Sequence, residues 1–191
     1  MADSSPWLIV GLGNPESRYA KNRHNVGFMA VDAICAELYP PPLWSDKFKA
    51  KTTSIRVGSQ RAVVVKPQTY MNRSGASVGA AATFHRVPVG QILVLHDEID
   101  FPFGRLAIKQ GGGHGGHNGL RDIIQAIGSR DFPRIRIGVG RPVHGDVSNF
   151  VLSDFSSDEA AELPNLLDRA RKAAEAVLTD GVSAAMNAHN G

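Results

Sequence analysis

The sequence has little cysteine and no long apolar run. Cys35 is the single cysteine among 191 residues, which excludes an internal disulfide and a zinc cluster built on thiolates. No apolar stretch approaches the roughly 18 residues that a membrane-spanning helix requires. Residues 1–6 lack the basic and then apolar layout of a secretory signal. We therefore expect a soluble, cytoplasmic protein.

Charge of neither sign dominates the chain. It has 21 Lys and Arg against 18 Asp and Glu, with 42% hydrophobic residues, a composition that favours a globular protein over a disordered or fibrous one. The basic surplus lies in residues 1–144, whereas residues 145–191 are net acidic. This balance is compatible with a polyanionic partner, but many proteins that never meet nucleic acid share it. Charge alone therefore does not identify a partner.

Strand and helix patterns alternate along the chain. We predict strands at 7–10, 50–57, 62–65, 91–95, 105–109 and 135–139, and helices at 25–38, 74–84, 120–127 and 158–188, the last broken near Gly181. Ser74 is expected to cap its helix. The hairpin at 50–65 adds antiparallel pairing, so the order favours an α/β fold with a mixed twisted β-sheet and helices on both faces. The length indicates a single domain over residues 1–191.

Four polar clusters follow predicted strands, where α/β proteins usually place their sites. The first spans 14–25 and opens like a dinucleotide fingerprint, but Glu16 stands where that fingerprint needs its third glycine, so we reject a Rossmann site. His24 in this cluster is a candidate general base, since a neutral imidazole can take a proton near pH 7. A structural histidine is the alternative interpretation.

Two further clusters leave their chemistry open. Residues 66–74 combine basic, aromatic and amide side chains, which suits a backbone phosphate and a stacked base but also an ordinary loop. Residues 96–100 contain the carboxylates Asp97, Glu98 and Asp100. One of them could orient His24, the group could bind magnesium, or it could form a solvated loop. From the residues alone, these three interpretations have similar weight.

The fourth cluster is a glycine-rich loop at 111–119 that leads into a helix. Its backbone N–H groups could approach an anion or an oxyanion, with Lys109 nearby as a point charge. The loop lacks the ending of a P-loop, which argues against nucleoside triphosphate binding. His114 and His117 could ligate a metal, but the mobile flanks make this a poor site. A flexible linker is the alternative.

A serine-hydrolase pattern also occurs in the chain. Gly75 to Gly79 matches a nucleophile elbow around Ser77, and Asp97 and His117 follow in the order of an α/β-hydrolase triad. The elbow needs its serine at a sharp turn directly after a strand, whereas Ser77 lies within a predicted helix. We therefore disfavour this alternative.

Read together, the clusters resemble the bacterial peptidyl-tRNA hydrolase family. The resemblance covers most of the chain and rests on six ordered motifs, which are Gly11–Pro15, Arg23–Asn25, Lys66–Asn72 with Ser74 and Gly75, Asp97–Asp100, Gly111–Leu120 and Arg136–Pro142. It implies a monomer without metal or other cofactor. It also implies hydrolysis of the ester that joins a peptide to the terminal ribose of tRNA, which recycles tRNA.

The resemblance also implies roles for individual residues. His24 would activate water, Asp97 would orient it, and Asn14 would help distinguish N-blocked peptidyl-tRNA from free aminoacyl-tRNA. The substrate's 3′ end and peptide would meet Tyr19, Tyr70, Met71, Asn72 and Asn118. Lys109 and Arg136 would hold a tRNA phosphate. On chemical grounds, the amide groups of Asn72 or Asn118 could serve as oxyanion donors.

Two positions and one short segment depart from the family pattern. Glu16 replaces a usual glycine and Asn22 a usual threonine, which puts in question how the loop beside Asn14 is placed. Residues 143–146 lack the basic side chains that the family often carries there. The sequence therefore does not establish how firmly the protein binds the body of the tRNA.

Overall fold

The computed structural model of the chain describes residues 5–191, and one seven-stranded sheet runs through it. The strands are β1 (Trp7–Gly11), β2 (Ser45–Lys47), β3 (Ala50–Val57), β4 (Gln60–Pro67), β5 (Ile92–Glu98), β6 (Leu106–Gln110) and β7 (Pro133–Gly138). Their order in the sheet is β2-β3-β4-β1-β5-β7-β6. β1, β4, β5 and β7 are parallel, whereas β2, β3 and β6 add antiparallel pairs. The predicted mixed sheet is confirmed.

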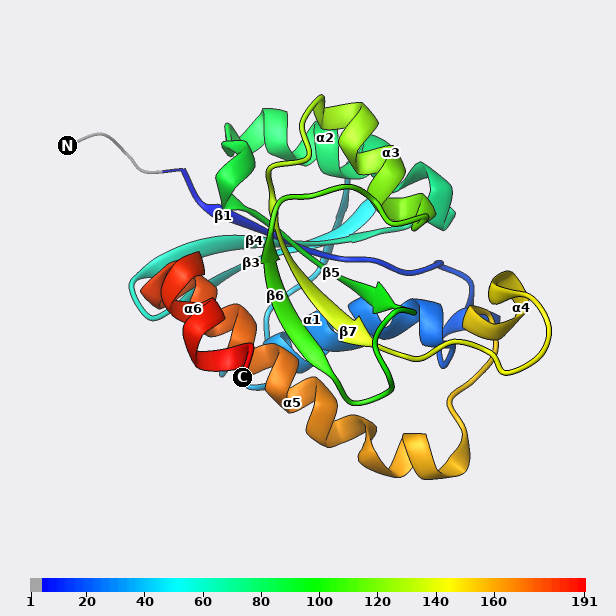
Figure 1. Cartoon of the computed structure of the whole chain (residues 1–191). Coiled ribbons are helices and arrows are strands. Elements are labelled where there is room, and N and C mark those ends of the chain that lie inside the picture. The colour runs from blue at the N-terminus through cyan, green and yellow to red at the C-terminus, as the bar shows by residue number, and fades with distance from the viewer. Residues whose placement is uncertain (1–4) are drawn as a thin grey trace.

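Helices cover both faces of this sheet (Figure 1). α1 (Val26–Ala36), α5 (Ser157–Asp180) and α6 (Val182–His189) pack on one face, and α2 (Ser74–His85) and α3 (Asn118–Ile127) pack on the other. Each face has its own apolar core, and alternate residues of β5 point into one or the other: Leu93 and Leu95 into the first, Ile92 and Val94 into the second. The α/β prediction, with helices on both faces, is confirmed.

Short helical segments complete the chain. The 3₁₀ turns are η1 (Ser17–Tyr19), η2 (Arg23–Asn25), η3 (Met71–Arg73) and η4 (Val89–Gln91), and α4 (Val147–Val151) is a single short helix beyond β7. Figure 1 shows α4 at the side of the molecule, near the start of α1. Among residues 5–191, no helix has the length and apolar character needed to cross a bilayer. Residues 1–4 of the segment considered for a signal lie outside the described part.

The connections place a crevice at the carboxyl ends of the central strands. β1 lies between β4 and β5, with Val10 opposite both Val65 and Val94. The chain leaves β1 through α1 on one face and returns to β5 through α2 on the other. Where successive crossovers take opposite faces, the strand ends open into a site. The loop after β1 and the end of β5 meet at this point.

A glycine at the start of α1 allows that meeting. A Cβ added to Gly27 would lie 2.4 Å from the Leu95 carbonyl oxygen and 2.6 Å from the Leu12 nitrogen. The helix therefore approaches the ends of β1 and β5 more closely than any side chain would permit. This approach carries the preceding turn, η2, with its residue His24, toward β5.

Several boundaries differ from the sequence prediction. β5 continues to Glu98, so His96 and Asp97 lie in the strand and not in a loop after it. Ser74 is not a cap: it is the first residue of α2, and its hydroxyl donates to the Met71 carbonyl at 2.7 Å because a 3₁₀ turn precedes the helix. β2, α4 and the 3₁₀ turns were not predicted. The break of the last helix at Gly181 is confirmed.

Candidate active site

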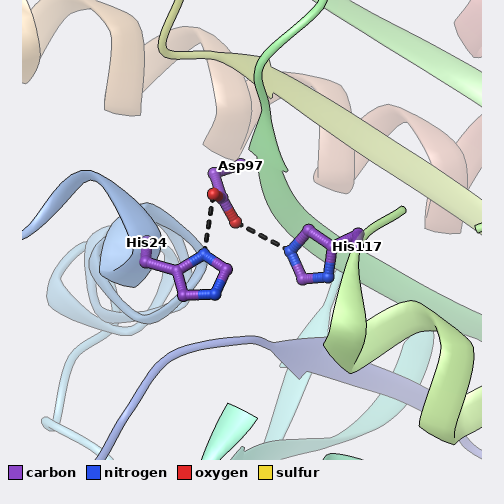
Figure 2. A group of neighbouring side chains, drawn as sticks. All are labelled: His24, Asp97 and His117. Atoms are coloured by element: carbon purple, nitrogen blue, oxygen red, sulfur yellow. Dashed lines mark hydrogen bonds and ion pairs between the residues drawn. The ribbon is translucent and has the colours of Figure 1, made fainter. Parts of the chain in front are cut away.

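Asp97 is the centre of a buried polar cluster at the end of β5. The residue is 4% exposed, and its two carboxylate oxygens each accept one hydrogen bond from a histidine (Figure 2). His24 lies on one side, in the turn before α1, and His117 on the other, just before α3. The crevice therefore joins three residues that are far apart in the chain.

His24 presents one free ring nitrogen. Its Nδ1 lies 2.8 Å from Asp97 Oδ2, so Nδ1 carries the ring proton and donates it to the carboxylate. No hydrogen bond within residues 5–191 engages the other nitrogen, Nε2, and Figure 2 shows it pointing away from Asp97. The His24 side chain is 14% exposed. An oriented imidazole with a free Nε2 is the arrangement that a general base needs.

The environment adjusts the pKa of His24 in two opposing ways. Burial lowers the pKa, whereas the negative charge of Asp97 and its hydrogen bond raise it. The raising effects prevail, so the pKa of His24 lies above its ordinary value of about 6.5. Burial by itself would raise the pKa of Asp97, but the two imidazoles lower it more. The pKa of this carboxyl therefore lies well below its usual range, and the group is ionised at pH 7.

His117 is the residue of the site that sequence reasoning missed. Its Nε2 donates to Asp97 Oδ1 at 2.8 Å, and its Nδ1 accepts from the backbone N–H groups of Gly119 at 3.1 Å and Leu120 at 3.3 Å. The ring therefore caps α3 and holds its proton on Nε2. The sequence prediction began this helix at residue 120 and weighed His117 only as a metal ligand or a serine-hydrolase histidine. Its position just ahead of a predicted helix was the signal that could have identified it as a cap.

A third histidine lies beneath this cluster. His96 is 3% exposed, and its Nδ1 donates to the carbonyl of Asp97 at 2.8 Å. Its ring meets that of His117 edge-on, with centroids 5.1 Å apart. Burial, and then the neighbouring His117, lower the pKa of His96 to about 3. His96 is therefore neutral at pH 7, with Nε2 lacking a partner among the described residues.

Asn14 is held in one orientation beside the cluster. Its side-chain Oδ1 accepts from the Met71 N–H at 2.8 Å, and its backbone N–H and carbonyl pair with the amide of Asn25 at 2.9 Å each. Because Oδ1 is occupied, the Nδ2 group is the part of the Asn14 side chain left to donate to a ligand. The loop after β1 and the turn before α2 are joined through this amide.

A cavity of about 120 Å³ adjoins His24. The wall opposite the polar cluster is mostly apolar and comes from α4 and the end of β5; it consists of Ile99, Val147, Ser148 and Val151. Asn118 at the start of α3 also borders the cavity. A second cavity, of about 270 Å³, lies between Asn72 and Asn118 on the other side of that helix end.

The two predicted substrate-binding tyrosines, Tyr19 and Tyr70, do not line the cavities next to His24 and Asn72. Tyr70 is exposed, and its hydroxyl donates to Glu16 at 2.7 Å. Glu16 also forms an ion pair with Arg18 at 3.0 Å. The Arg18 guanidinium in turn lies 4.6 Å from the ring centroid of Tyr19. Glu16, the departure from the family pattern, thus connects the loop after β1 to Tyr70.

The predicted basic pair lines one cavity of about 320 Å³ next to the site. Lys109 and Arg136 border it together with His96 and Glu98, and Glu98 accepts from Arg136 Nε at 2.8 Å. Arg134, which was not predicted, is buried under this cavity, and burial lowers its pKa to about 10. The cavity is therefore lined by three cationic side chains, Lys109, Arg134 and Arg136, and by the carboxylates Glu98 and Asp100.

The glycine-rich loop is held by Arg134 through its carbonyls, and the Gly111 N–H adds a hydrogen bond to the Phe132 carbonyl at 3.2 Å. Arg134 donates to the carbonyls of Gly112 and Gly113, the latter at 2.6 Å, and to that of Arg130 at 3.0 Å. These contacts hold the loop where it leads into His117. The loop is thus anchored to the sheet by a guanidinium.

The arrangement does not favour the two chemical alternatives. His24, Asp97 and His117 lie close enough for a metal, with candidate ligand atoms within 4.8 Å of one another, but both nitrogens of His117 are already in hydrogen bonds. Glu98 and Asp100 turn to Arg136 and Arg141, so the carboxylates do not converge as Mg²⁺ ligands.

Ser77 does not form a nucleophile elbow. It lies buried inside α2, and its hydroxyl donates to the backbone carbonyl of Lys49 at 3.1 Å. The predicted location of Ser77 in a helix is confirmed, and the serine-hydrolase alternative lacks its geometry.

Known proteins share this architecture over nearly the whole chain. The family model described as peptidyl-tRNA hydrolase matches residues 8–191. The peptidyl-tRNA hydrolase of Geobacter sulfurreducens is 47% identical over 96% of this chain and 94% of its own, and that of Mycobacterium avium is 46% identical over 96% and 97%. The crystal structure of peptidyl-tRNA hydrolase from Acinetobacter baumannii superposes with a TM-score of 0.90 at 38% identity, covering 97% of this chain and 95% of that one. The chain belongs to the peptidyl-tRNA hydrolase family.

Proposed function

We propose that this chain hydrolyses the ester bond between the peptide, or N-blocked aminoacyl, group and the tRNA of peptidyl-tRNA, which recycles tRNA during translation. One observation carries the proposal: His24 donates Nδ1–H to the buried Asp97 and presents a free Nε2 beside a cavity. The chain's membership of the peptidyl-tRNA hydrolase family supports the same reaction.

The steps follow from this geometry. His24 Nε2 takes a proton from water while the water oxygen attacks the ester carbonyl, and Asp97 stabilises the imidazolium that forms. The tetrahedral intermediate then collapses, the bond to the ribose oxygen breaks, and His24 returns its proton to that oxygen. The products are the free peptide carboxylic acid and the tRNA hydroxyl. Water and the side chains of the site carry every proton in this sequence.

Amide donors are available for the oxyanion. Asn118 borders the cavity next to His24, and the Nδ2 group of Asn14 is oriented because its Oδ1 is held by Met71. Asn72 lines the adjoining cavity with Asn118. Preorganised donors of this kind stabilise negative charge that develops in the transition state. Asn14 would in addition meet the blocked end of the peptide.

The RNA part of the substrate would follow the basic cavity. Lys109 and Arg136 supply the charge for a phosphate, with Glu98 fixing the Arg136 guanidinium through Nε. We propose that Tyr19, Tyr70, Met71 and Asn72, which lie in or beside η1 and η3, contact the 3′ end and the peptide of the substrate. Phosphate contacts position the substrate without reading its sequence.

Turnover of N-acetyl-aminoacyl-tRNA tests the reaction. The wild type is expected to release the N-acetyl-amino acid with EDTA present, and His24→Ala is expected to lose at least about 100-fold in kcat, the lower range for a general base. Abolition of wild-type activity by EDTA and its recovery with magnesium would instead support the alternative that the magnesium-binding interpretation of Asp97, Glu98 and Asp100 implies, a metal-dependent phosphodiesterase. Full activity in His24→Ala would support a non-catalytic RNA-binding role.

Salt dependence tests the basic pair. Lys109→Ala and Arg136→Ala are each expected to weaken tRNA binding and to reduce the slope of log affinity against log salt by about one counterion. Arg56→Ala, in a different cavity on β3 and β4, serves as the matched control. Slopes equal to the wild type in both variants would contradict a phosphate site at Lys109 and Arg136.

The finer setting of the reaction is part of the same proposal. We expect a cytoplasmic monomer, because peptidyl-tRNA arises where translation takes place and because the described residues of a single chain assemble the whole His24–Asp97–His117 group. Sedimentation with and without tRNA measures the oligomeric state. A dimer that is required for activity would contradict this part of the proposal.

A further inference from the structure

Arg23, the residue before His24, makes the most extensive buried polar contacts near the site. It is 7% exposed. Its Nη1 donates to Ser153 Oγ at 2.6 Å and to the Asp154 carbonyl at 2.8 Å, and its Nη2 donates to Glu159 at 2.7 Å. Its backbone N–H donates to the Ser153 carbonyl at 3.1 Å. Main chain and side chain of Arg23 therefore both bind residues 153–159.

Two aromatic rings enclose the same guanidinium. The Cζ atom of Arg23 lies 4.1 Å from the ring centroid of Phe150 and 5.7 Å from that of Phe155. A planar guanidinium stacks on such rings and donates from its edges at the same time, which an ammonium cannot do. The contacts thus engage both Nη groups and the face of the guanidinium, whereas Nε is buried without a partner among the described residues.

These contacts reach the wall of the site. Phe150 belongs to α4, the helix from which Val147, Ser148 and Val151 line the cavity opposite the polar cluster. Asn22 adds a second attachment, since its Nδ2 donates to Asp154 Oδ1 at 2.8 Å. The turn that carries His24 and the helix that closes the cavity are therefore attached to one another at Arg23.

We infer that Arg23 is a positioning residue: its guanidinium fixes the η2 turn that carries His24 and, through the same atoms, seats α4 against the cavity. This inference rests on the proposed function. A shift in η2 changes the distance from His24 to Asp97, and a shift in α4 changes the space left for the acyl group. Arg23 thereby affects both the base and the fit of the substrate without touching either reacting atom.

The consequence for pH dependence has a definite sign. Groups that face His24 or share its cavity are Asp97, Glu98 and His96 on β5, His117 before α3 and His114 in the glycine-rich loop. Of these, Asp97 raises the pKa of His24. Loosening η2 weakens that contact, so the pKa of His24 falls and the acid limb of the rate profile moves to lower pH.

Arg23→Lys is the informative variant because it keeps the positive charge next to His24 and removes the stacking and the second donor group. Arg171→Lys is the matched control. Arg171 lies on α5, outside the site, and forms ion pairs with Asp168 at 2.7 Å and with Glu175 at 3.0 Å. Both variants are compared with the wild type by kcat, KM, the acid limb of the profile and thermal unfolding.

We expect Arg23→Lys to lose about 10-fold or more in kcat and to show an acid limb at lower pH, while Arg171→Lys behaves as the wild type. A folded Arg23→Lys with wild-type kcat, KM and pH profile would overturn the inference, as would a lower melting temperature with no kinetic change. If Arg23→Lys does not fold, Phe150→Leu, which removes the ring but keeps the charge, decides by the same readouts. Failure of the wild type to release N-acetyl-amino acid would instead overturn the proposed function.

Discussion

Two loops on opposite sides of the crevice each bring a histidine to Asp97, and they do so differently. The loop after β1 presents His24, which donates from Nδ1 and leaves Nε2 free. The glycine-rich loop presents His117, which donates from Nε2 and uses Nδ1 to cap α3. Both distances to the carboxylate are 2.8 Å.

The comparison shows that the second ring nitrogen decides what each histidine can do. A ring whose other nitrogen is free can exchange a proton with a ligand, whereas a ring held by two backbone N–H groups keeps one tautomer. His117 therefore binds Asp97 and the start of α3, whereas His24 keeps a ring nitrogen for the proton transfer that we propose. Changes at each member of the cluster separate these roles.

Asp97→Asn has the largest expected effect. The amide has nearly the shape of the carboxylate but cannot accept from both histidines, and it removes the charge that raises the pKa of His24. We expect kcat to fall by about 10²- to 10⁴-fold, the range for loss of oriented general-base catalysis. Burial then lowers the pKa of His24 without the opposing effect of Asp97, so the acid limb of the residual activity should move to lower pH. An acid limb that stays in place would contradict the role of Asp97.

His117→Asn is expected to act more weakly and in the opposite direction on pH. Asparagine is a good helix cap, so α3 stays capped, but the shorter side chain does not reach Asp97. The Asp97 carboxylate then accepts a hydrogen bond from His24 only and stabilises the His24 imidazolium more strongly. The pKa of His24 rises further, and the acid limb of the rate profile moves to higher pH. We expect a loss of about 10-fold in kcat, as for groups that orient a reacting side chain. Movement of the acid limb to lower pH would show that His117 acts in another way.

His96→Asn concerns stability and not turnover. Because the pKa of His96 falls to about 3 in the folded state and is about 6.5 when unfolded, the unfolded chain holds the extra proton between these values. The free energy of unfolding therefore decreases as the pH falls through this window, by up to about 1.4 kcal/mol per pH unit.

The asparagine variant is expected to lack this contribution. Urea unfolding of both proteins at several values between pH 7 and pH 4 measures the difference in slope. Equal slopes would mean that His96 takes up its proton in the folded protein as readily as in the unfolded chain.

Ser77→Ala has the smallest expected effect. Its hydroxyl donates to the Lys49 carbonyl inside the core between α2 and the sheet, so its loss should cost about 1 kcal/mol in the free energy of unfolding. Activity should stay within about twofold of the wild type, because serine is not the nucleophile. A folded but inactive variant would restore the serine-hydrolase alternative.

Much of the fold could be predicted because local patterns determine it. The apolar run that ends at Gly11, the helical spacing from Phe28 to Leu38 and the hairpin around Gly58 each identify an element from neighbouring residues. The end of β5 could not be placed, since His96 and Asp97 are polar residues inside a buried strand. The burial of Asp97 depends on hydrogen bonds to His24 and His117, which lie far from it in the chain.

The site could be predicted only where a residue type suggests its own chemistry. His24 and Asp97 stand out as a base and a carboxylate, and the structure brings them together. His117 did not stand out, because a histidine in a glycine-rich loop suggests a metal ligand or a mobile segment before it suggests a helix cap. The contacts of Arg23 to residues 150–159 depend on tertiary packing, which no local pattern encodes.

The hydrogen bond from the Met71 N–H occupies Asn14 Oδ1, so Nδ2 is the polar atom of this side chain that remains for a ligand. Replacing Asn14 by aspartate preserves size, shape and the accepting oxygen that holds η3. It exchanges only the NH₂ group for an oxygen, so the part of the side chain left for a ligand changes from donor to acceptor and gains a negative charge. Under the proposed function, such a variant would keep its fold and repel the carbonyl that we propose Asn14 binds.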